Sequence, residues 1–246
     1  MFNCRNLNCN KKIFSMVQFC PYCGQVQAVI APQSTFVSAS SQLVKQKNKK
    51  KETFNRLKTS GSEVANKQNL TWSCGSQYWG QVEQGKCHGH GTMKWGPNSE
   101  YAGQIYTGSW KNNQRHGQGK QSYPDGSIYQ GEFQDNEFSG QGVLNFGDGE
   151  KYQGSFKHGH PHGKGIWFYS NGDRYQGNFR VGKRDRWGIA YYKDGRQYVG
   201  EWQNNEMHGL GVFYNSSKEP VQEGLFQNGR FVEKKTLDPK KFAYKW

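Results

Sequence analysis

Long apolar runs are absent from this 246-residue sequence, and no stretch approaches the 18 or more apolar residues that a membrane-spanning helix needs. The first nine residues also lack the apolar core of a secretion signal. We therefore expect a cytoplasmic protein in a reducing compartment. In such a compartment, cysteines act as metal ligands or thiols rather than as disulfides.

Apolar residues are scarce throughout, at 33% of the chain, and the mean hydropathy is -1.01. These values exclude a conventional globule of this length. Glycine is abundant, with 32 residues, and aromatic residues reach 15%. This combination is typical of short strands joined by tight turns, in which rings supply most of the buried surface.

Acidic residues are also few, with 19 Asp and Glu against 33 Lys and Arg, and the net charge is +14. The excess lies in the flanks: residues 1–30 carry +3, residues 31–68 carry +6 and residues 230–246 carry +4. Residues 69–229 carry only +1. This distribution excludes a uniformly basic binding face in the middle of the chain.

Four of the six cysteines lie near the beginning of the chain: Cys4, Cys9, Cys20 and Cys23. Two close pairs can place four thiolates tetrahedrally around one structural Zn²⁺, whose binding would supply the folding energy of so short a module. The segment 19–24, Phe-Cys-Pro-Tyr-Cys-Gly, resembles small zinc-ribbon modules, although four residues separate the first pair where two are usual. We expect a zinc-ribbon-like module over residues 1–30. The alternative is a thiol-rich leader that binds metal only weakly.

Residues 31–68 are rich in Ser, Lys, Gln and Asn and show no sustained helical period, which predicts a basic flexible linker. Its lysine cluster consists of Lys45, Lys47, Lys49, Lys50 and Lys51. Contact with anionic lipid or nucleic acid, or a nuclear import signal, are the alternatives for this cluster.

A repeat begins at Tyr78. Tyrosines begin six units at positions 78, 106, 129, 152, 175 and 198, so four successive steps are 23 residues long and the first is 28. The third and fourteenth residues of every unit are glycine, and the fifth is aromatic in five units. Positions 1, 3 and 5 share one face of a strand, where glycine leaves room for neighbouring rings.

The eighth residue of each unit is Gly or Asn, which predicts a positive φ at a turn. Four units end with Asp-Gly or Asn-Gly, which predicts a two-residue hairpin turn. Each unit is therefore a β-hairpin, and the fold class is all-β: an elongated solenoid of stacked antiparallel hairpins, stabilised by its neighbours.

The pattern Tyr-x-Gly-x-aromatic followed by His-Gly-x-Gly resembles the MORN repeat (membrane occupation and recognition nexus). Segments 106–110 and 116–119 match it fully, as do 198–202 and 208–211, whereas Asp185 and Arg186 replace His-Gly in the fifth unit. Half-units at 72–75 and 224–229 extend the array, so the resemblance covers 69–232. It implies a scaffold, tether or partner-binding module, and some similar proteins have been linked to phospholipid membranes.

The repeat histidines lie three positions before the glycine at position 14 and are interpreted as turn-stabilising hydrogen-bonding groups. His158, His160 and His162 alternate along the chain, which leaves a transition-metal site as the sharper alternative. No nucleophile motif and no phosphate-binding glycine loop is present. We therefore expect a protein that is not an enzyme.

Three binding hypotheses remain. The first is a protein partner on the concave, ring-lined face, and its candidate residues are Tyr106, Trp110, Tyr198, Trp202, Arg184 and Arg186. The second is attachment to anionic phospholipid at the inner membrane face, through the lysine cluster and the basic tail. The third is nucleic-acid binding by the zinc module and linker. The tail, 233–246, is expected to cap the last hairpin, and an exposed strand edge would allow a homodimer.

Overall fold

A computed structural model of the chain describes residues 27–28 and 67–238. These residues form one antiparallel sheet of 16 strands, in which the spatial order of the strands is the chain order. The strands are β1 (Gln27–Ala28), β2 (Lys67–Trp72), β3 (Gln77–Glu83), β4 (Lys86–Lys94), β5 (Ile105–Lys111), β6 (Gln114–Ser122), β7 (Ile128–Gln134), β8 (Glu137–Asn145), β9 (Lys151–Lys157), β10 (His160–Phe168), β11 (Arg174–Arg180), β12 (Lys183–Tyr191), β13 (Gln197–Gln203), β14 (Glu206–Tyr214), β15 (Pro220–Gln227) and β16 (Arg230–Lys234).

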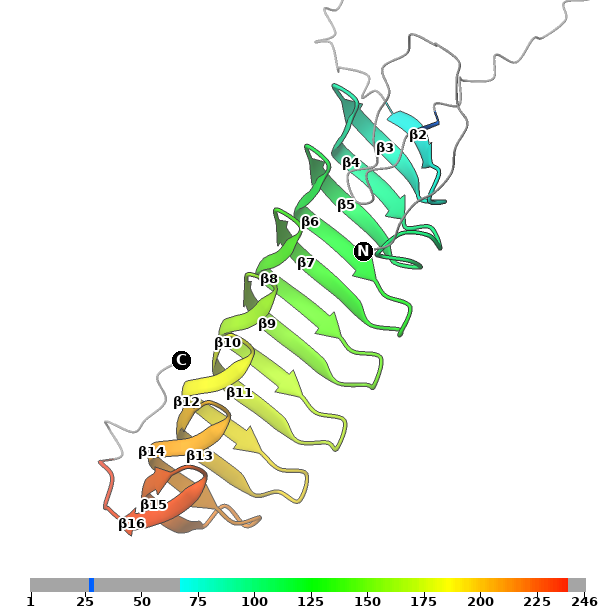
Figure 1. The fold of residues 1–246 in the computed structure, drawn as a ribbon. Coiled ribbons are helices and arrows are strands. Elements are labelled where there is room, and N and C mark those ends of the chain that lie inside the picture. The colour runs from blue at the N-terminus through cyan, green and yellow to red at the C-terminus, as the bar shows by residue number, and fades with distance from the viewer. Residues whose placement is uncertain (1–26, 29–66, 239–246) are drawn as a thin grey trace, which may run out of the picture.

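The sheet is long and twisted, and its strands cross the long axis from β2 at one end to β16 at the other (Figure 1). Each strand pairs only with its neighbours in the sequence, so each unit is stabilised by the units beside it. The described part of the chain contains no helix that is long and apolar enough to span a membrane. The predicted all-β solenoid of stacked hairpins is therefore confirmed.

Tight turns join the two strands of each unit. The seventh and eighth residues both have positive φ, for example 50° at Asn112 and 68° at Asn113, which is the type I′ geometry of a two-residue hairpin. The prediction of positive φ at the eighth position is confirmed in every unit, by Gly85, Asn113, Asn136, Gly159, Gly182 and Asn205.

Wider loops join one unit to the next, and here the prediction of two-residue turns was wrong. In the loop after β6, the Tyr123 N–H donates to the Ser127 carbonyl (2.9 Å), and the Gly126 N–H donates to the Tyr123 carbonyl (3.1 Å). Three residues are therefore enclosed, and only Gly126 has positive φ, at 87°. Asp125 accepts the Ser127 N–H at 2.8 Å, which favours the three-residue form.

The core is a ladder of rings on one face of the sheet, which we call the ring face. The Tyr106 ring meets the Trp110 ring of its own unit at 5.0 Å and the Phe133 ring of the next unit at 4.9 Å, both edge to face. The same contacts recur along the array and end at Tyr198 and Phe226, at 5.0 Å. Such pairs contribute about 0.5–1.5 kcal/mol each beyond their buried area.

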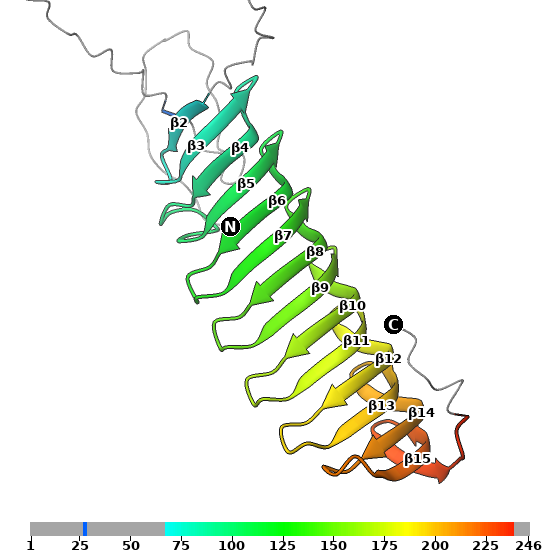
Figure 2. The ribbon, with the colours of Figure 1, turned by 180° about the vertical axis from the view of Figure 1, so that it is seen from behind.

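The tight-turn ends of the hairpins curl over along one edge of the sheet, as the two opposite views show (Figures 1 and 2). A register shift lies inside each hairpin, for example between Gly108 and Trp110. Between the flanking pairs β5 has one residue and β6 has three, and such a bulge bends the strand and increases its twist. The bulge therefore accounts for the curl, and the curled ends form one side of the candidate site.

Candidate partner-binding groove

Four of the predicted partner-binding residues belong to the core. Tyr106 and Tyr198 are 0% exposed, Trp110 is 2% exposed and Trp202 is 4% exposed. Rings of the neighbouring units cover them, as Phe133 covers Tyr106 and Phe226 covers Tyr198. The Trp202 indole N–H also donates to the Gly188 carbonyl at 3.2 Å, so its polar edge is satisfied within the sheet.

Two separate cavities lie between the tight-turn edge and the loop edge of the ring face, and we call them together the groove. The cavity nearer the C-terminal end has a volume of about 440 Å³. The loop edge contributes Tyr169, Asn171, Asp173 and Tyr192. The tight-turn edge and the floor contribute Arg184, Trp202, Asn205, Glu206, Met207 and Gly229. Because the lining comes from two edges, three successive units and the half-unit that follows them, only the stacked array forms this cavity.

A second cavity, of about 570 Å³, lies nearer the N-terminal end of the array, among the first three units. It is lined by Lys86, Glu100, Tyr101, Asn112, Asn113, Gln114, Arg115 and Asn136. Arg115 and Arg184 both occupy the tenth position of their unit. The groove therefore presents an arginine at two places along its length.

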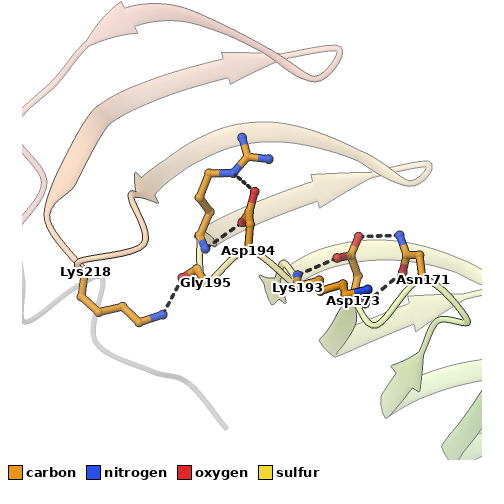
Figure 3. Close-up of polar contacts among 7 residues, drawn as sticks. Asn171, Asp173, Lys193, Asp194, Gly195 and Lys218 are labelled. Atoms are coloured by element: carbon orange, nitrogen blue, oxygen red, sulfur yellow. Dashed lines mark hydrogen bonds and ion pairs between the residues drawn. The ribbon is translucent and has the colours of Figure 1, made fainter.

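The loop wall of the C-terminal cavity is held by hydrogen bonds between successive loops (Figure 3). Asp173 accepts the Lys193 N–H of the next loop at 2.8 Å, and the Lys218 ammonium donates to the Gly195 carbonyl at 2.8 Å. Within one loop, the Asp173 N–H donates to the Asn171 side-chain oxygen at 2.9 Å. These contacts fix Asp173 at the rim of the groove.

Arg184 and Arg186 were predicted together, but the structure separates them. Arg184 lines the cavity, and its guanidinium lies 4.3 Å from the centre of the Trp202 ring. Arg186 does not line it: this side chain is 79% exposed, and its Nε lies 3.8 Å from a carboxylate oxygen of Asp185. Arg186 also has a φ of 60°, at the position where the other five units have glycine.

Tyrosine rings at the eighteenth position form much of the loop wall, and sequence reasoning had not assigned them to a site. Burial raises the pKa of Tyr169 and of Tyr192, and the nearby Arg184 partly opposes both shifts. These tyrosines stay neutral at physiological pH, so the wall offers apolar ring surface with neutral hydroxyls. The signal was present in the sequence, since the eighteenth residue is aromatic in five units.

The histidine cluster does not converge. His158 instead lies opposite Glu137, with Nδ1 and Oε2 3.2 Å apart. Within residues 27–28 and 67–238, no three His, Cys, Asp or Glu side chains are placed to hold a metal ion. Of the repeat histidines, His88 Nδ1 lies 3.2 Å from Glu83, within ion-pair distance but without hydrogen-bond geometry.

The predicted zinc ligands and lysine cluster lie outside the described residues, and so do the last eight residues of the tail. Those ligands and lysines are Cys4, Cys9, Cys20 and Cys23, and Lys45, Lys47, Lys49, Lys50 and Lys51.

The MORN repeat family model matches five segments, 78–100, 106–128, 129–151, 152–174 and 198–217. The chain therefore contains MORN repeats, as the sequence pattern indicated. The unmatched unit, 175–197, is the one in which Asp185 and Arg186 replace His-Gly. That unit nevertheless forms the same hairpin as its neighbours. Its Tyr175 and Phe179 are buried, like the equivalent rings of the other units.

Solved structures show only a weak likeness. The TCP domain of Drosophila melanogaster SAS-4 (dCPAP), in complex with a proline-rich motif of Ana2 (dSTIL), is 15% identical, with 68% of this chain and 96% of that chain covered and a TM-score of 0.35. The TCP10 domain of Danio rerio CPAP is 14% identical, with 67% and 92% covered and a TM-score of 0.21. A search of curated proteins finds no match.

Proposed function

We propose that the MORN array is a non-catalytic scaffold that binds a segment of a protein partner in the ring-face groove. The observation that carries the proposal is the C-terminal cavity, whose lining combines the rings of Tyr169, Tyr192 and Trp202 with five polar or charged side chains. A concave site that joins ring surface to fixed polar side chains is typical of binding sites. Peptide segments dock in grooves of this kind through anchor side chains.

Selection of displayed random peptides on the full chain tests this proposal. Two variants place charge in the groove, Tyr169→Glu and Met207→Glu, and Gln153→Glu on an exposed site of the opposite face of β9 is the matched control. We expect the groove variants to weaken binding of selected peptides about ten-fold or more, because each buries an unpaired charge against the ligand. Equal binding by all three variants would reject the groove.

Attachment to anionic membranes is a second proposal, favoured by the +6 charge of residues 31–68 and the +4 charge of residues 230–246. Each basic residue near such a surface contributes about 1 kcal/mol, so the attachment would be reversible and sensitive to salt. Flotation with phosphatidylserine vesicles at low salt tests it, and a protein that stays unbound there would exclude it.

Zinc binding by the cysteine module is also a proposal, supported by the spacing of Cys4, Cys9, Cys20 and Cys23. Elemental analysis of the purified full chain should find one zinc per chain. A Cys20→Ser, Cys23→Ser variant should lose it.

A further inference from the structure

The two groove arginines differ in their hydrogen bonds. In the second unit, Arg115 Nη1 donates to Gln121 Oε1 at 2.9 Å, and Nη2 donates to the Asn136 carbonyl at 2.9 Å. Gln121 is 0% exposed and donates in turn to Gln104 at 3.1 Å. Arg115 is therefore bound to an internal acceptor on the ring face.

In the fifth unit that acceptor is missing. The sixteenth residue, which is Gln121 in the second unit, is Ala190 in the fifth. The Arg184 guanidinium makes only one hydrogen bond, from Nη2 to the Asn205 carbonyl at 2.6 Å, which corresponds to the bond between Arg115 and Asn136. No carboxylate of the described residues lies within 4.0 Å of this guanidinium. Its buried Nε has no hydrogen-bond partner there, but the same is true of Arg115 Nε, so the two guanidinium groups differ at Nη1 alone.

Arg184 is nevertheless held in one position. Its backbone N–H donates to the Asn205 side chain at 2.8 Å, and its guanidinium lies over the Trp202 ring at 4.3 Å. A guanidinium with open donors, fixed by stacking and by a backbone contact, is preorganised for a planar acceptor such as a carboxylate. The donors open to a ligand are those of Nη1, because Nε is buried, and a charge-assisted hydrogen bond to Nη1 would add affinity.

The charges around the cavity narrow the class of ligand. Asp173 and Glu206 line the same cavity as Arg184. A doubly charged phosphate group would be repelled by both carboxylates, and so would a run of acidic residues. A single carboxylate faces Arg184 with less repulsion, and basic or polar neighbours in the ligand would complement Asp173 and Glu206.

We propose that Arg184 anchors one Asp or Glu side chain of the bound partner segment, whereas Arg115 does not serve as an anchor. This inference rests on the proposed function of the groove. It names the partner as a segment with one acidic residue, flanked by apolar residues for the tyrosine wall and by basic or polar residues.

Peptides selected on the full chain provide the test, each paired with a version in which its acidic residue is replaced by the amide. Affinities are measured by fluorescence anisotropy for wild type, Arg184→Gln, Ala190→Gln and the matched control Arg115→Gln. Ala190→Gln installs the acceptor that occupies Arg115 in the second unit. Circular dichroism checks the fold of each variant, and Arg184→Gln serves alone if Ala190→Gln does not fold.

We expect the acid-to-amide change to weaken binding about ten-fold or more in wild type and in Arg115→Gln. The same change should have little effect in Arg184→Gln, where the guanidinium is absent. It should also have little effect in Ala190→Gln, where the introduced side chain already accepts the guanidinium hydrogen bond. Groove-dependent peptides without an acidic preference would overturn the anchor and leave the groove proposal intact. Stronger binding of a phosphoserine peptide would overturn the single-carboxylate class, and peptides insensitive to Tyr169→Glu would reject both proposals.

Discussion

Val181 has a φ of 48° and is the seventh residue of its unit, at the tip of the hairpin between β11 and β12. Other units have Gln, Asn, Asp or His at this position, with φ between 47° and 50°. Positive φ is unfavourable for a β-branched residue, whereas Asn adopts it more readily. Val181 is also 59% exposed, so it gains little from burial. The tip of the fifth unit is therefore strained.

Val181→Asn should raise the free energy of unfolding by about 1 kcal/mol, because Asn relieves this strain without removing a buried contact. The matched control is Asn204→Val, which places valine at the equivalent position of the next unit and should lower stability by a similar amount. Urea denaturation followed by circular dichroism measures both. A destabilised Val181→Asn would show that the strain argument is wrong.

Within each hairpin, the tyrosine at position 1 packs directly against the glycine at position 14. The Tyr129 ring crosses its own hairpin and donates its hydroxyl to the Glu132 carbonyl at 2.8 Å. A Cβ on Gly142 would lie 2.5 Å from the Tyr129 hydroxyl oxygen and 2.7 Å from a ring carbon. The fourteenth position therefore accepts only glycine while the first remains tyrosine.

Gly142→Ala should lower the free energy of unfolding by about 3 kcal/mol, since the methyl group must displace a packed ring. Gly149→Ala, in the loop of the same unit, is the control: its φ is 89°, but no atom lies within 4 Å of the added Cβ. That variant should cost only about 1–2 kcal/mol, from the backbone alone. Equal losses in thermal or urea denaturation would contradict the packing argument.

At the scale of the whole molecule, the six tyrosines that begin the units form one buried column: Tyr78, Tyr106, Tyr129, Tyr152, Tyr175 and Tyr198. Burial raises the pKa of every one of them above the ordinary tyrosine value. The stability of the whole array therefore depends on pH in the alkaline range, because ionising any tyrosine of the column opposes the packing of its neighbours.

The array should unfold cooperatively above pH 10. In the unfolded chain, tyrosines ionise near pH 10, the ordinary value, whereas the buried ones ionise only at higher pH. The unfolded state therefore binds fewer protons above that pH, so the stability from these groups is full below pH 10 and falls as pH rises further. The phenolate absorbance contributed by the six column tyrosines and the circular dichroism should change together. Column tyrosines that titrate near pH 10 while the sheet remains folded would contradict this.

The sequence by itself determined the repeating part of the molecule. The 23-residue period, the glycines at positions 3 and 14 and the positive-φ residue at position 8 are local features, and each reports a constraint within one hairpin. They were sufficient for the stacked sheet and for the placement of rings on one face. The loop geometry was missed, because Asp-Gly is compatible with two kinds of turn and the flanking Tyr123–Ser127 pair decides between them.

Only the tertiary structure decided where a ligand can bind. Stacking buried Trp110, and it brought Tyr169 and Met207 to opposite walls of one cavity. It also distinguished Arg184 from Arg115, because the difference lies in a residue six positions away that shares the same face. Exposure and unsatisfied hydrogen bonds depend on contacts between units, and a pattern that repeats within each unit does not contain that information.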